Sequence, residues 1–174
     1  MKKNANQNVH KLALAALFAA FTTVATLVIQ IPTPTKGYLN LGDCFVNLSA
    51  WILGGVYGTA AAGIGSAMAD MISGYFIYAP ATLIIKCLMA FSSYWIYQKL
   101  SEKSDSFRAR IFAACIAEII MIIGYAGFEA VLYQSLTTAL LGMPSNIVQG
   151  IAGAAASVTL YELVMKKIPN LHIK

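Results

Sequence analysis

The sequence has 174 residues, of which 59% are hydrophobic and only 11% are charged, and its mean hydropathy is +0.69. A soluble domain usually carries about 25% charged residues, so this composition excludes an ordinary soluble domain and indicates an integral membrane protein. The formal net charge of +5 would suit nucleic-acid binding, but the placement of the basic residues favours another explanation.

Apolar runs of helical length, separated by glycine, proline and polar residues, predict a single all-α membrane domain of six transmembrane helices over residues 1–174. The first run, residues 12–31, is uncharged and longer than the ~7–15 residues of a signal peptide's apolar region, so we predict a retained helix that ends at Pro32. We expect a tight turn at Gly54-Gly55 and another at residues 142–144, which read Gly-Met-Pro. The predicted helices cover residues 10–31, 42–53, 56–75, 80–99, 108–135 and 144–166.

Basic residues are concentrated on one predicted side of the membrane. They lie before the first helix, between the fourth and fifth helices, and after the sixth, and only Lys36 and Lys86 lie elsewhere. Because cytoplasmic loops carry an excess of lysine and arginine, we predict that both termini are cytoplasmic. Attraction to anionic lipid headgroups accounts for the positive charge, so we expect membrane lipid, and no nucleic acid, as a partner.

Polar side chains recur at one depth in this otherwise apolar chain. At about 1.5 Å per residue, Asp70 in the third helix and Lys86 in the fourth both fall in the outer half of the membrane. Ionisable groups within a membrane are costly and indicate a function, and a few polar anchors among aromatic walls are typical of a ligand pocket. The candidate substrate-binding residues are Tyr38, Asn40, Asp43, Asp70, Tyr78, Lys86, Glu129, Tyr133, Asn146 and Gln149.

These residues also have a purely structural interpretation. Asp70 and Lys86 could form an ion pair that only joins the third helix to the fourth, and Glu118, in the fifth helix, could do no more than bond a neighbour. The tyrosines could belong to the aromatic belt found at membrane interfaces. The sequence alone leaves these alternatives open.

The first helix carries a stripe of small residues in its cytoplasmic half. Ala15 and Ala19, and likewise Ala16 and Ala20, are spaced four residues apart. Such stripes let helices approach closely within lipid. They serve either internal packing or contact with a partner, and these four alanines are the candidate partner interface.

Several patterns typical of enzymes are absent from the sequence. There is no G-x-x-x-x-G-K-[ST] phosphate-binding loop and no H-E-x-x-H motif. The three cysteines have no metal-ligand spacing, and both histidines lie near the ends of the chain. Asp43 ends a near match to the G-x-G-D motif of intramembrane aspartyl proteases, but Asn40 stands where the first glycine should be. We therefore expect neither an enzyme nor a metal or other cofactor.

Three strings carry a resemblance to a known family: GYLNLGD at 37–43, GSAMADMISGY at 65–75 and YAPATLIIK at 78–86. Together they resemble the substrate-binding S components of energy-coupling factor (ECF) transporters, most of all the riboflavin-type and hydroxymethylpyrimidine-type branch. The resemblance extends over the whole chain, through its length, its six predicted helices and its alanine-rich first helix.

The resemblance implies a multi-pass protein of the bacterial cytoplasmic membrane that binds a vitamin or similar micronutrient from outside. It also implies a transmembrane coupling subunit and two cytoplasmic ATPases as partners, which fits the missing phosphate-binding loop. In the family the alanine stripe contacts the coupling subunit, and the loop after the first helix, here residues 35–40, closes over the site. Substrate contacts come largely from that loop and the last three helices, which brings in Lys86, Glu129, Asn146 and Gln149.

The substrate itself is less sharply indicated. Acidic and basic anchors among aromatic side chains favour a small flat heterocycle with hydroxyl groups, and a pyridoxine-like or hydroxymethylpyrimidine-like vitamin is our hypothesis. The alternative function is a self-sufficient transporter driven by an ion gradient, with Asp70 and Glu118 as proton sites.

Overall fold

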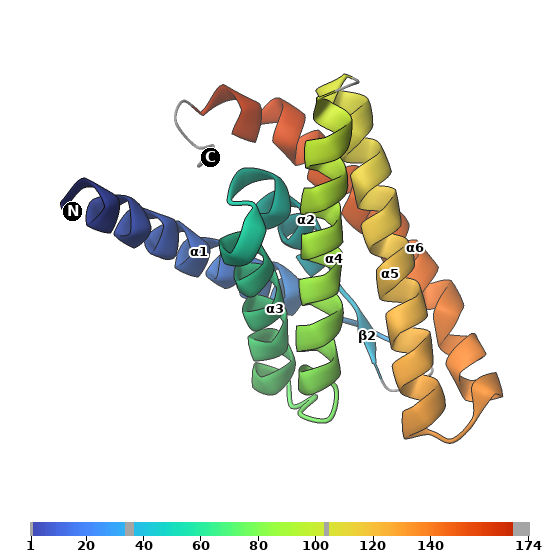
Figure 1. Cartoon of the computed structure of the whole chain (residues 1–174). Helices are drawn as coiled ribbons and strands as arrows, with labels where there is room; N and C mark the ends of the chain where they lie inside the picture. Colours follow the sequence, from blue (N-terminus) through green and yellow to red (C-terminus); the bar gives the residue numbers. More distant parts are fainter. Residues whose placement is uncertain (1, 34–36, 103–104, 169–174) are drawn as a thin grey trace.

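Six α-helices and a small two-stranded hairpin make up the described part of the chain, which in this computed structural model comprises residues 2–33, 37–102 and 105–168. The prediction of six helices is thus confirmed within those ranges (Figure 1). Part of the predicted loop 35–40, and the basic residues Lys36, Lys103 and Lys174, lie outside the described residues. The elements are α1 (Lys2–Val28), β1 (Ile31–Pro32), β2 (Tyr38–Leu39), α2 (Gly42–Ile52), α3 (Gly55–Ile72), α4 (Ala79–Ser101), α5 (Ser106–Leu132), α6 (Leu136–Leu163) and a 3₁₀ turn, η1 (Met165–Lys167).

The predicted start of the last helix is wrong. We expected a turn at residues 142–144, but α6 already begins at Leu136 and contains Pro144. A proline within a helix removes its own N–H donor and crowds the carbonyl group of the preceding turn, and membrane helices tolerate both effects. The helix start is set instead by Ser135, whose side chain accepts a hydrogen bond from the Thr138 backbone N–H. The preceding turn passes through Gln134, which has a positive φ of 49°.

Helix α2 lies at the centre of the fold. All of its residues except Phe45 are buried, and it contacts α1, α3, α4 and α6. Its 11 residues span about 16 Å at about 1.5 Å per residue, roughly half of the ~30 Å hydrocarbon core of a bilayer. Helix α2 is therefore too short to cross such a layer by itself, and the longer helices surround it.

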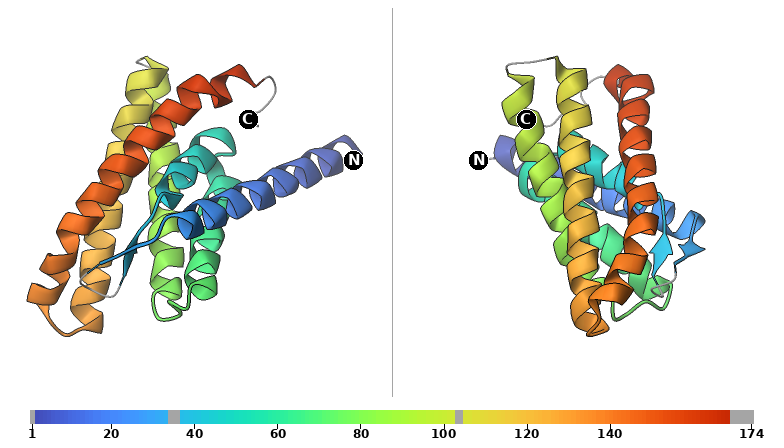
Figure 2. Two further views of the ribbon diagram at one scale, coloured as in Figure 1. Left: turned by 180° about the vertical axis from the view of Figure 1, so that it is seen from behind. Right: turned by 90° about the vertical axis from the view of Figure 1, so that its right-hand side faces the viewer.

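The longer helices form an antiparallel series, α3 to α6, in which each packs against the next, while α1 crosses onto α3 and α2. The beginning of α1 projects away from the other helices (Figures 1 and 2). The α4–α5 connection and the end of α6 lie at the upper end of Figure 1, whereas the β hairpin and the α3–α4 and α5–α6 connections lie in its lower half. The β hairpin therefore lies toward one end of the bundle, and the α4–α5 connection and the end of α6 lie at the other.

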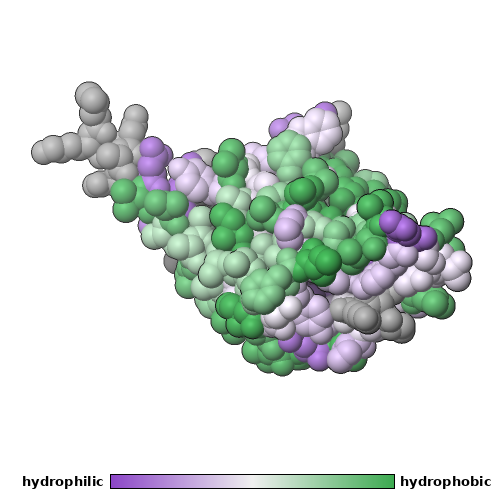
Figure 3. Space-filling model, turned by 90° about the horizontal axis from the view of Figure 1, so that it is seen from below, coloured by the Kyte–Doolittle hydropathy of each residue, from purple (hydrophilic) through white to green (hydrophobic). Residues whose placement is uncertain are grey.

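The outward faces of the longer helices are apolar. Large hydrophobic side chains are exposed on all five of them, for example Val24, Met68, Phe91, Ile123 and Ile151. Hydrophobic residues also dominate the face seen from below in Figure 3, where polar residues occupy smaller areas. So much exposed apolar surface marks contact with a membrane or a partner. Within the described residues, α1, α4 and α5 each contain a stretch long and apolar enough to span a membrane.

Part of the alanine stripe on α1 is used for packing within the chain. A Cβ atom at Gly65 of α3 would lie 2.4 Å from the Ala19 carbonyl oxygen, so the two backbones touch. The Thr23 hydroxyl donates to the Gly65 carbonyl at 2.8 Å. Ala15 is buried, whereas Ala16 and Ala20 are exposed. The stripe therefore has an inner edge that seats α1 on α3 and an outer edge that the chain leaves uncovered.

We expect Gly65→Ala to destabilise the fold by about 1–3 kcal/mol, because the added methyl group forces α1 away from α3. Gly127→Ala on α5 is the matched control, since nothing lies within 4 Å of a Cβ atom there. Thermal unfolding of both variants in detergent would check this. Equal midpoints would show that α1 does not depend on the close approach.

Candidate functional site

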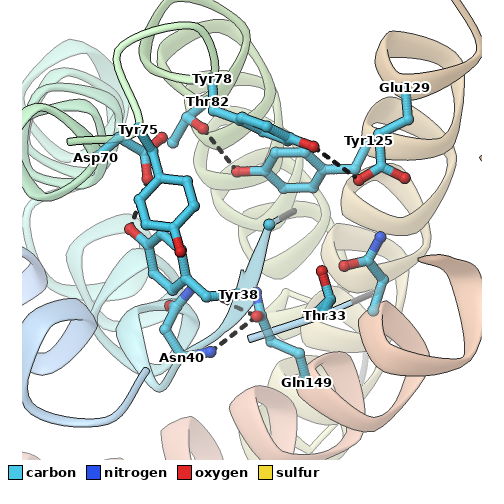
Figure 4. Close-up of a pocket in the computed structure, with 12 residues that line it drawn as sticks. Thr33, Tyr38, Asn40, Asp70, Tyr75, Tyr78, Thr82, Tyr125, Glu129 and Gln149 are labelled. Atoms are coloured by element: carbon cyan, nitrogen blue, oxygen red, sulfur yellow. Dashed lines mark hydrogen bonds between the residues drawn. The ribbon is translucent and has the colours of Figure 1, made fainter. Parts of the chain in front are cut away.

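A polar pocket opens between the β hairpin and the lower halves of α3 to α6 (Figure 4). Its cavity volume is about 30 Å³, well below the roughly 300–1,000 Å³ of small-molecule sites, so the lining side chains nearly fill it in this structure. Its lining residues come from six separate segments: Thr33, Gly37, Tyr38 and Asn40 after α1; Asp70; Tyr75 and Tyr78 before α4; Thr82; Tyr125 and Glu129; Asn146 and Gln149.

Tyrosine rings form the walls of this pocket. The Tyr38 and Tyr75 ring centroids are 4.7 Å apart, and Tyr75 meets Tyr78 edge to face at 6.4 Å. The Tyr78 hydroxyl lies 3.3 Å from Oε1 of Glu129, and the Tyr125 hydroxyl lies 3.0 Å from Oγ1 of Thr82. The rings thus present flat apolar faces, while neighbours hold the hydroxyls of Tyr78 and Tyr125, an arrangement suited to a flat ligand with polar edges.

Asp70 provides a buried carboxylate on one side of the pocket. The Tyr38 hydroxyl donates a short hydrogen bond, 2.6 Å, to its Oδ1 atom. Burial, together with the charge of Asp70, raises the pKa of the Tyr38 hydroxyl, so that this group stays protonated and remains a donor. The other oxygen of Asp70, Oδ2, is buried, and no hydrogen bond of good geometry reaches it among the described residues.

The strand segment over the pocket is tied to α6 by amide groups. Oε1 of Gln149 accepts hydrogen bonds from the backbone N–H of Asn40 at 3.0 Å and from its side-chain Nδ2 at 3.3 Å. On its other side, Nε2 of Gln149 donates to Oδ2 of Asp43 at 2.7 Å. Gln149 therefore connects the pocket's cover to the buried helix α2.

Lys86 lies behind the pocket and pairs with Asp43, not with Asp70. Its Nζ atom bonds Oδ1 of Asp43, and both side chains are almost completely buried. The alternative of an Asp70–Lys86 ion pair is therefore wrong. Helix α2 lies between the longer helices and brings its first-turn carboxylate to α4, and sequence spacing along α3 and α4 could not indicate that.

A second chain of polar contacts continues from this pair into the bundle. Nδ2 of Asn47 donates to Oε1 of Glu118 at 3.1 Å, and Oδ1 of Asn47 accepts from the Ser93 hydroxyl at 2.9 Å. A Cβ atom at Gly153 would lie 2.7 Å from the Asp43 Cβ atom, so only glycine admits this approach of α6. Glu118 thus has the bonded neighbour expected for a structural residue. Among the described residues, no three acidic, histidine or cysteine side chains gather as metal ligands would.

Most of the residues proposed from the sequence meet at the pocket. Seven of the ten line it. Of the other three, Asp43 contacts Gln149, Lys86 lies near the Tyr125 ring, and Tyr133 contacts Tyr78, so each has a lining residue as its neighbour. Sequence reasoning left out lining residues such as Thr82 and Tyr125. Both stand one helical turn before a residue that was singled out, Lys86 and Glu129 respectively, so the four-residue spacing could have indicated them.

Lys86→Met should destabilise the protein by about 3–5 kcal/mol, because it leaves the Asp43 charge buried without its partner. Lys99→Met, at the exposed end of the same helix, should cost less than about 1 kcal/mol through its lost contact with the Trp95 ring. Adding Asp43→Asn to Lys86→Met should recover part of the loss. Denaturant unfolding in detergent would measure this, and equal stabilities of the two lysine variants would contradict it.

Comparison with known proteins finds a family model, a sequence relative and a solved structure that this chain resembles. Residues 6–167 match the family model of the ECF-type riboflavin transporter S component. A Pyrococcus woesei protein, described as "Uncharacterized protein in gap 3'region", is 33% identical over 147 residues, which are 84% of this chain and 95% of that protein. A solved structure, "Structure and mechanism of the S component of a bacterial ECF transporter", is 20% identical with a TM-score of 0.70, covering 91% of this chain and 97% of the other. Because the family model spans nearly the whole sequence, the chain belongs to the ECF-type riboflavin transporter S component family.

Proposed function

We propose that this chain is the substrate-binding subunit of an ECF-type importer and binds a small heterocyclic vitamin in the polar pocket. Membership of the family makes it a transporter subunit and not an enzyme. The observation that carries the proposal is the pocket itself: tyrosine rings, two carboxylates and three amide side chains line one cavity at the end of an otherwise apolar bundle. Polar groups gathered in this way within lipid are costly unless they bind something.

The charge distribution supports a membrane orientation with both termini in the cytoplasm. Basic residues lie at the end of the bundle that points upward in Figure 1, opposite the pocket: Lys99 near the end of α4, Arg108 near the start of α5, and Lys166 in η1 after α6. By the positive-inside rule, the pocket then faces the outside, where an importer meets its substrate. In this arrangement α2 is buried among the spanning helices and reaches only part of the way across.

The lining favours a one-ring heterocycle of the pyridoxine-like or hydroxymethylpyrimidine-like kind. The cavity volume is only about 30 Å³ and the tyrosines meet across it, as Tyr38 and Tyr75 do at 4.7 Å between ring centroids, so a single ring would displace the fewest side chains. Riboflavin, which the family model's description names, is a larger, three-ring alternative. The segment from Tyr38 to Asn40 would cover the bound ligand, since Gln149 holds it over the cavity.

We expect the purified chain alone to bind such a vitamin with submicromolar affinity. Asn146→Ala should weaken binding by at least about tenfold, or ~1.4 kcal/mol, since Asn146 lines the pocket. Thr159→Ala, on the same helix outside the pocket lining, is the control. Mass spectrometry of co-purifying small molecules would identify the ligand, and calorimetry would measure both variants. An Asn146→Ala variant with unchanged affinity would dismiss the proposed site.

Reconstitution separates this proposal from the gradient-driven alternative. An S component alone in liposomes should bind its ligand without accumulating it. Accumulation driven by a proton or sodium gradient, without any partner, would overturn the proposal and support the secondary transporter.

The partner face proposed for the coupling subunit is the groove between α1 and α3. Leu12, Ala16, Ala20 and Val24 line it from α1, and Ile64 is among the residues that line it from α3. The uncovered outer edge of the alanine stripe lies along this groove. Because small residues admit a close helix–helix contact in lipid, a helix of the coupling subunit is the proposed occupant, with two ATPases beyond it.

Ala16→Trp and Ala20→Trp should block assembly with the coupling subunit while leaving ligand affinity unchanged, because their side chains point into the groove and away from the pocket. Leu17→Trp is the matched control, since Leu17 is exposed but outside the groove lining. Co-purification of the co-expressed subunits would measure assembly. Wild-type yields for both alanine variants would rule out this face.

A further inference from the structure

Among the described residues, the pocket lining has acidic groups and no cation, while Lys36, between Thr33 and Gly37, lies outside the described residues. None of its twelve lining residues is a lysine, arginine or histidine, whereas Asp70 and Glu129 are both buried carboxylates. The nearby cation, Lys86, is bonded to Asp43 and only 2% exposed, and it lies 5.5 Å from the centroid of the Tyr125 ring. Its charge is already balanced by Asp43, so it offers no counter-charge to an anion in the cavity.

The two carboxylates stand on opposite sides of the cavity, with tyrosine side chains between them (Figure 4). Each already accepts a tyrosine hydroxyl: Asp70 that of Tyr38 and Glu129 that of Tyr78. These hydroxyl protons are therefore directed at the carboxylates and away from a ligand. What the two sides offer a ligand is mainly acceptor oxygens.

Oδ2 of Asp70 is the clearest of these acceptors. It is buried, in a residue only 5% exposed, and no hydrogen bond of good geometry reaches it among the described residues, although the Thr82 hydroxyl lies near this carboxylate. A buried acceptor without a donor loses its hydration and gains nothing in return, so a native structure that keeps one needs a reason for it. A donor on a bound ligand would supply the missing bond.

We infer that this pocket selects its ligand by charge: it accepts a flat heterocycle that is neutral or cationic and directs N–H or O–H donors at Asp70 and Glu129, and it rejects a ligand that carries a carboxylate or phosphate. This inference rests on the proposed function and narrows its substrate class. An anionic group would be brought next to two buried carboxylates of like charge, and no unpaired cation among the described lining residues would offset them. Amino-substituted and protonated ring nitrogens are the donors that fit.

Matched ligand pairs test the inference directly. Thermal-shift and calorimetric titrations would compare pyridoxine with 4-pyridoxic acid, pyridoxal with its 5′-phosphate, and 4-amino-5-hydroxymethyl-2-methylpyrimidine with its 5-carboxylate, with riboflavin as a large neutral probe. We expect each neutral or cationic member that binds to bind at least about tenfold tighter than its anionic counterpart. An anionic member that binds as tightly as its counterpart would overturn charge selection but leave the S-component function intact. Failure of every probe, riboflavin included, would count against both.

Variants of Asp70 test whether this residue is responsible for the selection of neutral or cationic ligands over anionic ones. Asp70→Asn should weaken binding of the neutral or cationic ligand by at least about tenfold. It should also reduce the ratio of that ligand's affinity to the affinity of its anionic counterpart. Asp105→Asn, at the exposed start of α5, keeps a good helix cap and should change neither quantity. If Asp70→Asn does not fold, Glu129→Gln provides the same comparison. A discrimination ratio unchanged in the folded variants would overturn the assignment.

Discussion

The Asp43–Lys86 pair is the contact on which the rest of this structure depends. It joins the buried helix α2 to α4, and through Gln149 it reaches α6 and the segment that covers the pocket. A buried ion pair is a weak source of net stability, because desolvation offsets much of the attraction. The pair instead fixes the helix arrangement, because separating the two charges would leave each of them buried without a partner in an apolar interior. Three helices and the pocket's cover are thereby held in one arrangement.

The lipid surroundings explain why polar contacts, and not hydrophobic burial alone, specify how these helices pack. The outer helices meet lipid with apolar side chains, so burying hydrophobic surface gives little preference for one helix arrangement over another. Specificity then has to come from close backbone contacts and polar bonds. Gly65 against Ala19 supplies the first kind, and the series from Asp43 through Asn47 to Ser93 supplies the second. Helix α2 carries much of the polar series because it is the helix that lipid does not touch.

The two proposed activities occupy separate parts of the molecule. The pocket lies at the lower end of α3 to α6, and the groove proposed for the coupling subunit lies along α1 and α3. Helix α3 belongs to both, since Asp70 lines the pocket and Ile64 lines the groove. A subunit that must hold its ligand while it docks on a partner benefits from this separation, because a contact on one face need not disturb the other. The shared helix is where occupancy of the pocket could affect the partner face.

The sequence by itself determined the class of protein, the number of helices and most of the pocket residues. Apolar runs and their breaks report directly on helices, and ionisable and amide residues stand out in an apolar chain, which is why Asp70, Glu129 and Gln149 could be named in advance. Only the tertiary structure decided which partner each charge takes. Lys86 bonds Asp43 because a short helix lies inside the bundle, and the turn before α6 falls at Gln134 and not at Pro144 because a serine cap outweighs a proline. The pairing of Lys86 depends on how elements distant in sequence pack together, and no local pattern encodes that. The start of α6 depends on a local cap at Ser135, which the proline obscured in the sequence.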